Sequence, residues 1–292
     1  MAGTDRVGGE LTRRTIEAQP AWLRALRVDR RLPSGRVLLT GCGTSFHAAQ
    51  TGGDALQALE LVLEPRREAD LLVLVSHQGK TPLTLEAARA WPGPKWAVTG
   101  TPQSPLADLC GEVVVCTPEL ERSFCHTASY VCAVAALAEL RGEDVGWLPG
   151  AVEAALAERE PVSDHDRWLI AGAGRDWPTA QEAALKLREG AFVAAEAYET
   201  EQLLHGHLAA VDERVRAFVL QGEGRAAERA QDAVAALREL GVETTLVPTR
   251  HPALDIVRFQ LLTVDLAASR AVNPDLIRRD DERWARARAA YA

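Results

Sequence analysis

Trp177-Pro-Thr-Ala-Gln-Glu-Ala-Ala-Leu-Lys-Leu-Arg-Glu189 is the stretch that decides the fold. It follows Trp168-Leu-Ile-Ala-Gly-Ala-Gly174, an apolar run that ends in glycines and therefore predicts a buried strand and a sharp turn. Pro178 suits the first turn of a helix, where its missing N–H is not needed. The pattern predicts a strand, a turn and a helix, and chemistry is expected at that turn.

Three charged residues share one face of this predicted helix. Glu182, Lys186 and Glu189 stand at positions i, i+4 and i+7 among alanines and leucines. The ordinary interpretation is an exposed face with a weak Glu182–Lys186 ion pair. The scarcity of lysine favours function, because only Lys80, Lys95 and Lys186 are lysines among 33 lysine and arginine residues. An ammonium can transfer a proton where a guanidinium cannot.

Composition limits the class of protein and the kind of partner. The 292 residues are 47% hydrophobic, which is enough for one or two buried cores. The net charge of -8 and the pI near 5.5 argue against nucleic acid and anionic membrane as partners. The five cysteines form no C-x-x-C pair and follow no signal peptide, so we expect reduced thiols in a cytoplasmic protein. No apolar run approaches the ~20 residues of a membrane span.

The first half of the chain alternates short apolar runs with helical patterns. Strands are predicted at residues 37–40, 71–75, 96–99 and 113–116, and helices at 46–61, 82–90 and 131–140. Residues 11–26 predict a helix, or two helices broken near Pro20. Alternating strands and helices are typical of a doubly wound parallel α/β sheet.

The second half repeats this order after a polar segment that contains prolines. We place a domain boundary in that segment, which divides the chain into residues 1–150 and 151–292. Strands at 168–171, 216–220 and 242–247 are evident there, with helices at 151–157, 178–189, 226–240 and 254–271. Two halves with the same plan suggest an internal duplication, and therefore two such domains in tandem.

Two strand-ending loops carry glycine and hydroxyl residues. In Gly41-Cys-Gly-Thr-Ser45 the glycines allow a sharp turn, and Thr44 and Ser45 can cap the next helix and face an anion. A dinucleotide fingerprint is excluded because Phe46 stands at its third glycine position. Ser76-His-Gln-Gly-Lys-Thr81 follows the next strand, and it is not a P-loop because the first glycine that motif requires is absent.

Together these motifs resemble the sugar isomerase (SIS) domain family. The matching runs are Gly41–Ser45, Ser76–Thr81, Glu121–Tyr130, Glu182–Glu189, Ala195–Tyr198 and Leu204–Gly206. The layout is closest to the isomerase part of glucosamine-6-phosphate synthase, which implies two SIS-type, flavodoxin-like domains and a homodimer. Met1 is not followed by the cysteine nucleophile of a glutaminase domain, so glutamine is not expected as a source of ammonia.

The resemblance implies a role for each motif. The residues that would hold a phosphorylated sugar or amino sugar are Cys42, Gly43, Thr44, Ser45, Ser76, His77, Gln78, Thr81, His126 and Thr127. Glu189 would move a proton between C1 and C2 through an enediol, with Lys186 as a nearby charge or proton donor. His205 would open the sugar ring from the neighbouring subunit of the homodimer. No cofactor is expected, and the histidines lack the spacing of metal ligands.

The sequence departs from the family pattern at several of these positions. Gln78 replaces the second serine of the phosphate loop. His126 and Ala128 replace the usual small hydroxyl residue and lysine before the helix at 131–140. The lysine of the family's C-terminal tail is absent. Its role is either vacant or filled by Arg278 or Arg279.

Three functions remain open. The first is a phosphosugar isomerase, either an aldose–ketose isomerase or an amino-sugar-phosphate isomerase and deaminase. The second is a deglycase that cleaves sugar–amine adducts, with His77 and His126 reshaping the pocket. The third is a non-catalytic sugar-phosphate sensor, which Gln202 and His207 favour because the family usually has Glu and Pro there. A sensor has no need for the base Glu189, so an enzyme is the preferred interpretation.

Overall fold

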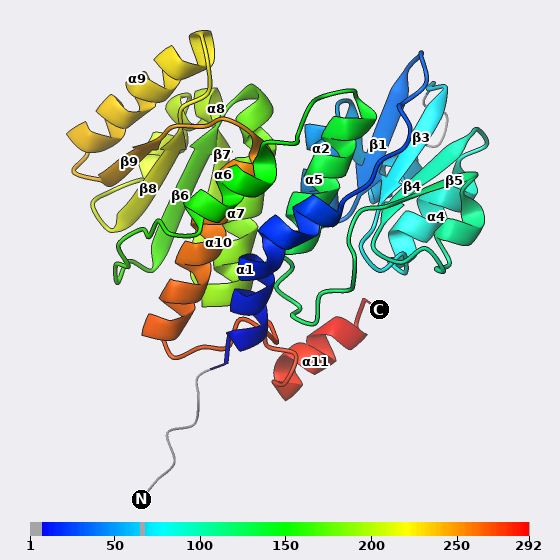
Figure 1. Cartoon of the computed structure of the whole chain (residues 1–292). Helices are drawn as coiled ribbons and strands as arrows, with labels where there is room; N and C mark the ends of the chain where they lie inside the picture. Colours follow the sequence, from blue (N-terminus) through cyan, green and yellow to red (C-terminus); the bar gives the residue numbers. More distant parts are fainter. Residues whose placement is uncertain (1–7, 65–67, 292) are drawn as a thin grey trace, which may run out of the picture.

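Two parallel sheets, one in each half of the chain, form the frame of the protein (Figure 1). The computed structural model describes residues 8–64 and 68–291. The prediction about a glutaminase nucleophile next to Met1 therefore lies outside the described residues. One layer of helices lies between the sheets, and other helices cover their outer faces. The predicted fold class, two doubly wound parallel α/β sheets, is confirmed.

The first sheet has the strand order β2-β1-β3-β4-β5, which is the flavodoxin-like order. Its strands are β1 (Val37–Gly41), β2 (Ala55–Gln57), β3 (Leu71–Val75), β4 (Lys95–Thr99) and β5 (Glu112–Val115). The helices of this half are α2 (Thr44–Thr51), α3 (Ala58–Leu63), α4 (Pro82–Ala90) and α5 (Ala128–Leu140). Every residue of β3 is buried, as expected for a central parallel strand covered on both faces.

The second sheet has the order β7-β6-β8-β9, which repeats the first four places of the first sheet. Its strands are β6 (Arg167–Gly172), β7 (Ala194–Glu199), β8 (Val215–Leu220) and β9 (Glu243–Val247). The helices are α7 (Trp177–Ala191), α8 (Thr200–Leu204), α9 (Arg225–Glu239), α10 (Pro252–Ser269) and α11 (Glu282–Ala289). The quoted stretch is thus β6, a turn and α7, as predicted.

One apolar core joins the two halves. It contains buried side chains of α1 (Glu10–Ala25), α5, α6 (Leu148–Ala155), α7 and α10, together with the inner faces of both sheets. The predicted domain boundary between residues 150 and 151 falls within α6, and it stays a prediction. Because α7 packs against both α2 and α10, the polar face of α7 is brought against the first half of the chain.

Of the two alternatives predicted for residues 11–26, the single helix is correct, because α1 runs without interruption through Pro20. Two other local predictions are wrong. The helix predicted over 46–61 is α2, β2 and α3, since Gly53 has a φ of 136°, which favours glycine and ends the helical path. The second half has four strands rather than three. β7 was missed because its alanines and glutamates have low strand propensity, which pairing with β6 overrides.

Among the described residues, none of the helices combines the length and apolar character that crossing a bilayer requires.

Candidate active site

The two predicted phosphate loops meet in an open cleft at the C-terminal edge of the first sheet. β1 leads into Cys42–Ser45 and β3 leads into Ser76–Thr81, so both loops leave the sheet at the edge where open α/β folds bind ligands. The cleft has a volume of about 400 Å³ and is lined by Cys42, Gly43, Thr44, Ser45, Ser76, His77, Gln78, Lys80, Thr81, Phe124, His126, Glu189, Ile277 and Arg279. It therefore brings together Glu189 and every predicted substrate-binding residue except Thr127.

The first loop is held in a tight turn. A Cβ at Gly41 would lie 2.7 Å from the carbonyl carbon of Ser45, so only glycine fits there. The prediction that Thr44 and Ser45 cap α2 is wrong, because Gly43 is the N-cap residue and no side chain caps the helix. The Thr44 hydroxyl instead donates to Glu182 Oε1 at 3.1 Å. Thr44 therefore joins the cleft to α7.

The second loop presents two neighbouring hydroxyls. Ser76 Oγ and Thr81 Oγ1 are 3.4 Å apart, and Thr81 is the N-cap residue of α4. Pro82 begins that helix, where its missing N–H costs nothing. An anion bound here would meet hydroxyl donors and the positive end of the α4 dipole. Lys80, on the same loop, forms no ion pair within the described ranges.

α7 carries a buried row of charges rather than an exposed one. The side chains of Glu182 and Lys186 are fully buried, so the exposed-face interpretation is wrong for this pair. Glu189 is 26% exposed and reaches the cleft. Lys186 Nζ lies 2.5 Å from Glu189 Oε2 and 3.5 Å from Glu182 Oε1. Burial opposes the charge of Lys186, but the two carboxylates outweigh it and raise the pKa of the amine. Lys186 is thus a fixed positive charge beside Glu189.

Glu121 is a buried cap at the start of α5. Its carboxylate accepts hydrogen bonds from the backbone N–H groups of Thr127, Ala128 and Ser129, and from the hydroxyls of Thr127 and Ser129. Burial would raise the pKa of this carboxyl, but His126 and the Ser129 hydroxyl outweigh burial and lower it. Because the Thr127 hydroxyl belongs to this cap, Thr127 supports the loop rather than lining the cleft.

Two histidines stand beside this cap. His77 Nε2 accepts the Glu121 N–H at 3.1 Å, so the ring proton of the neutral form is on Nδ1. The rings of His77 and His126 meet edge to face, with centroids 5.1 Å apart. Burial lowers the pKa of His77 to about 4 and also lowers that of His126. Both rings are therefore neutral at pH 7 and offer hydrogen bonds rather than positive charge to a ligand.

The C-terminal tail, which follows α10 from residue 270, forms one side of the cleft. The Asp275 carboxylate accepts three backbone N–H groups and the Thr12 hydroxyl at the start of α1, and its carbonyl accepts the Phe124 N–H. Ile277 and Arg279 follow in the cleft, where the Arg279 guanidinium lies 4.0 Å from the centre of the Phe124 ring. Asp275 thus ties the two ends of the chain together at the cleft.

The turn that aims the tail is strained. Ile277 and Arg278 have φ values of 43° and 59°, in a region that non-glycine residues, and branched ones above all, rarely adopt. The Arg278 guanidinium lies over the rings of Phe192 and Trp284 at 4.1 and 4.3 Å. Phe192 follows the end of α7, so the strained turn packs beside the helix that carries Glu189. Strain of this kind is concentrated at functional sites.

His205 lies outside this cleft in the single chain. It follows α8, its side chain is 73% exposed, and its Nε2 lies 2.9 Å from Glu201 Oε1. The chain on its own therefore does not bring His205 to Glu189.

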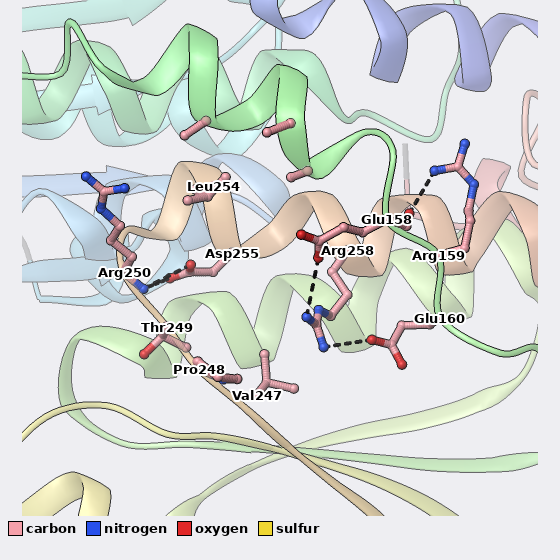
Figure 2. A pocket seen from close by; sticks show the side chains of 13 residues that line it. Glu158, Arg159, Glu160, Val247, Pro248, Thr249, Arg250, Leu254, Asp255 and Arg258 are labelled. Carbon is pink, nitrogen blue, oxygen red and sulfur yellow. Dashed lines mark hydrogen bonds and ion pairs between the residues drawn. The ribbon is translucent and has the colours of Figure 1, made fainter.

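A second hollow of about 400 Å³ lies between α6, the end of β9 and α10 (Figure 2). Figure 2 shows Arg258 between Glu158 and Glu160, at N–O distances of 3.8 and 2.7 Å. The carboxylate of Asp255 accepts the Arg250 N–H. Glu158 and Glu160 thus neutralise Arg258, whereas the cleft of the first sheet offers hydroxyls, a cation and a carboxylate to a ligand. The cleft is the better candidate for an active site.

Sequence reasoning missed several residues that line the cleft. Lys80 could have been found from the sequence, because it is one of three lysines and stands inside a predicted phosphate loop. Phe124 and Ile277 had none, since their places depend on the path of the tail. No three side chains of the metal-binding types gather in a metal-binding arrangement within residues 8–64 and 68–291.

Comparisons with known proteins relate the chain to phosphosugar enzymes by sequence and by fold. The model of the SIS domain family matches residues 162–276. The glutamine–fructose-6-phosphate aminotransferase (isomerizing) of Gloeobacter violaceus is 27% identical over 82% of this chain and 50% of its own length. The chain spans about half the length of the curated relatives it matches.

Solved structures share the architecture at low sequence identity. A tagatose-6-phosphate ketose/aldose isomerase from Escherichia coli superimposes with a TM-score of 0.78 and 18% identity, over 91% of this chain and 95% of that one. A glucosamine-6-phosphate deaminase from Thermotoga maritima gives a TM-score of 0.75 and 20% identity, over 91% and 97%. These likenesses show the fold.

Proposed function

We propose that the chain is a phosphosugar isomerase, because the model of the SIS domain family matches residues 162–276 and the chain is similar to about half of a glutamine–fructose-6-phosphate aminotransferase (isomerizing). The reaction would be the aldose–ketose isomerisation of a sugar phosphate, or the isomerisation and deamination of an amino-sugar phosphate. One observation carries the proposal. Glu189 opens into the same cleft as two loops built to hold an anion.

The phosphate would be held by the two loops. Ser76 and Thr81 supply hydroxyl donors, and Ser45 stands in the first turn of α2. Helix N-termini attract anions because their first N–H groups lack helical partners. Lys80 adds a positive charge that no described acid neutralises. Binding at this end would fix the sugar so that its reacting carbons lie near Glu189.

Glu189 would be the base of the reaction. It would take a proton from one of the two carbons C1 and C2, giving an enediol, and return that proton to the other. A single carboxylate is enough when both carbons present the same face. The charge of Lys186, whose Nζ lies 2.5 Å from Glu189 Oε2, would hold the carboxylate in place before the sugar binds.

Ring opening would require a second subunit. We place His205 of a partner subunit at the cleft of a homodimer, where it would move a proton between the ring oxygen and the C1 hydroxyl. The side chain of His205 is 73% exposed on its own subunit, where it pairs with Glu201, so a partner's cleft could reach it. We also place the protein in the reducing cytoplasm, because all five cysteines are free thiols.

Proton NMR in D₂O tests this function. The protein would be incubated with a panel of hexose, pentose and amino-sugar phosphates. We expect deuterium to enter C1 or C2 of at least one ketose or aldose phosphate, with free ammonia appearing only if an amino sugar is the substrate. Tight binding of panel members without deuterium entry would contradict the isomerase and favour a sugar-phosphate sensor.

A further inference from the structure

We propose that phosphate binding in the cleft is transmitted to Glu189 through Thr44, Glu182 and Lys186, so that the base is released only when a phosphate is present. This inference rests on the proposed function, because it takes the cleft as a phosphosugar site and Glu189 as the base. It assigns Glu182 and Thr44 as positioning residues that act through Lys186.

Glu182 joins the two halves of the chain. It lies on α7 with no exposed surface, yet two of its three partners come from α2. Its Oε2 lies 2.7 Å from His47 Nδ1, which fixes one side of the carboxylate. Its Oε1 accepts the Thr44 hydroxyl at 3.1 Å and lies 3.5 Å from Lys186 Nζ. The same oxygen is thus shared by a hydroxyl that lines the cleft and an ammonium that does not.

Lys186 lies at unequal distances from two carboxylates. Its Nζ is 2.5 Å from Glu189 Oε2 but 3.5 Å from Glu182 Oε1. While the Thr44 hydroxyl satisfies Glu182 Oε1, the ammonium is bound mainly to Glu189. An ammonium hydrogen bonded to Glu189 Oε2 competes with a sugar proton for that oxygen, so the contact opposes the use of Glu189 as a base.

A bound phosphate changes this balance. Thr44 begins α2 at the mouth of the cleft, and the charged oxygens of a bound phosphate would compete with Glu182 Oε1 for its hydroxyl. If the Thr44 hydroxyl turns to the phosphate, Glu182 Oε1 loses a donor in a fully buried place. An unsatisfied buried oxygen is costly, and Lys186 is already near enough to replace the hydroxyl.

The consequence is the release of Glu189. As Lys186 moves toward Glu182, its bond to Glu189 Oε2 weakens and that oxygen becomes available for the proton of the sugar. His47 holds the other oxygen of Glu182, so the ammonium moves and the carboxylate stays. The binding energy of the phosphate, which is remote from the reacting carbons, would thus be used to activate the base.

The three lysines of this chain make the test direct. In protein labelled with ¹³C-lysine, only Lys80, Lys95 and Lys186 give Cε signals, and each is assigned by substitution with arginine. Lys80 lines the cleft and reports phosphate binding. Lys95 donates to the carbonyls of Trp91 and Gly93 and serves as the unperturbed reference. The probe is inorganic phosphate.

We expect phosphate to shift the Lys80 and Lys186 signals of the wild-type protein together. In Thr44→Val, which keeps the shape but removes the hydroxyl, more phosphate should be needed, but at saturation the Lys80 shift should remain and the Lys186 shift should be lost. Thr44→Ser should restore it. An unchanged Lys186 response in Thr44→Val would overturn the coupling alone. If phosphate shifted neither Lys80 nor Lys186 in the wild type, the phosphate site of the proposed function would fail with it.

Discussion

At the scale of single residues, two buried and paired carboxylates hold together the elements around the cleft. Glu121 holds five donors at the start of α5, and Glu182 holds donors from two helices. Buried charges of this kind are tolerated because both oxygens of each carboxylate have partners, and removing one partner lowers stability strongly. The neutral histidines and the cations at the cleft are therefore the residues whose chemistry can be tested one at a time.

The lowered pKa of His77 predicts that the protein loses stability in acid. Its folded pKa of about 4 lies below the ordinary value near 6.5, because burial disfavours the charged ring. The unfolded chain therefore binds a proton first, and the stability contributed by neutral His77 is lost as pH falls from about 6.5 toward 4. We expect the Tm of the wild type to fall more steeply than that of His77→Gln between pH 7 and pH 5. Parallel curves from thermal melts followed by circular dichroism would contradict this assignment.

Lys80 predicts a specific contribution to phosphate binding. It stands in the second loop at the cleft and has no acidic partner in the part of the chain that the structure describes. A hydrogen bond to a charged group contributes about 1.5 kcal/mol, so Lys80→Ala should weaken the affinity for a sugar phosphate roughly tenfold. Isothermal titration calorimetry measures the change. The matched control Lys95→Ala should bind normally, and equal losses in both variants would argue against a phosphate role for Lys80.

At the scale of elements, local sequence decided the helices and strands that carry the cleft, whereas their ends depended on distant contacts. Gly41 and Gly43 follow an apolar strand, so the turn into α2 could be predicted from neighbouring residues. The tail could not be predicted. Asp275 reaches Thr12, which is 263 positions away in sequence, and no local pattern indicates that contact.

Asp275 predicts a coupled loss of stability and binding. Its carboxylate caps α1 with four hydrogen bonds, and its neighbours place Arg279 at the cleft. Asp275→Ala should lower the free energy of unfolding by about 2–3 kcal/mol, because buried donors lose a charged acceptor. It should also weaken sugar-phosphate binding. Urea unfolding and calorimetry check both effects. The exposed Asp280→Ala should change stability by less than about 0.5 kcal/mol, and a similar loss there would count against the cap.

Asp255, in the first turn of α10, predicts that stability falls as pH rises, which is opposite to the effect of His77. Burial raises the pKa of Asp255 to about 7, although the Arg250 N–H opposes the rise. The folded state therefore favours the protonated acid, and the stability it contributes below pH 4 is lost as pH rises through 7. Asp255→Asn should gain stability relative to the wild type as pH rises from 5 to 8, measured by urea unfolding. A difference that is independent of pH would contradict the raised pKa.

At the scale of the whole molecule, the sequence was informative about the two sheets and about the loops at 41–45 and 76–81, because these follow from local turns and apolar runs. It did not indicate which residues that are distant in sequence lie close together in space. Glu182 looked like part of an exposed stripe, and it is buried because α2 of the other half covers α7. His205 illustrates the remaining limit, since one chain alone does not bring it to the cleft.

A shared active site predicts complementation between inactive subunits. If His205 enters the cleft of a partner subunit, Glu189→Gln and His205→Gln proteins are each inactive, but a mixed dimer contains one intact site. Equal mixtures that have exchanged subunits should recover about a quarter of the wild-type rate of deuterium exchange. No recovery, with mixed dimers confirmed by mass spectrometry, would rule out donation across the interface.

The most direct test of the account compares wild type, Glu189→Gln and the distant surface control Glu239→Gln in D₂O with a phosphosugar that the wild type exchanges. Glu189→Gln keeps the shape of the side chain but removes the base. We expect its deuterium entry at C1 and C2 to fall at least about a thousandfold, while calorimetry shows sugar-phosphate binding nearly unchanged and the control behaves as wild type. Deuterium exchange at the wild-type rate in Glu189→Gln would contradict the assignment of Glu189 as the base.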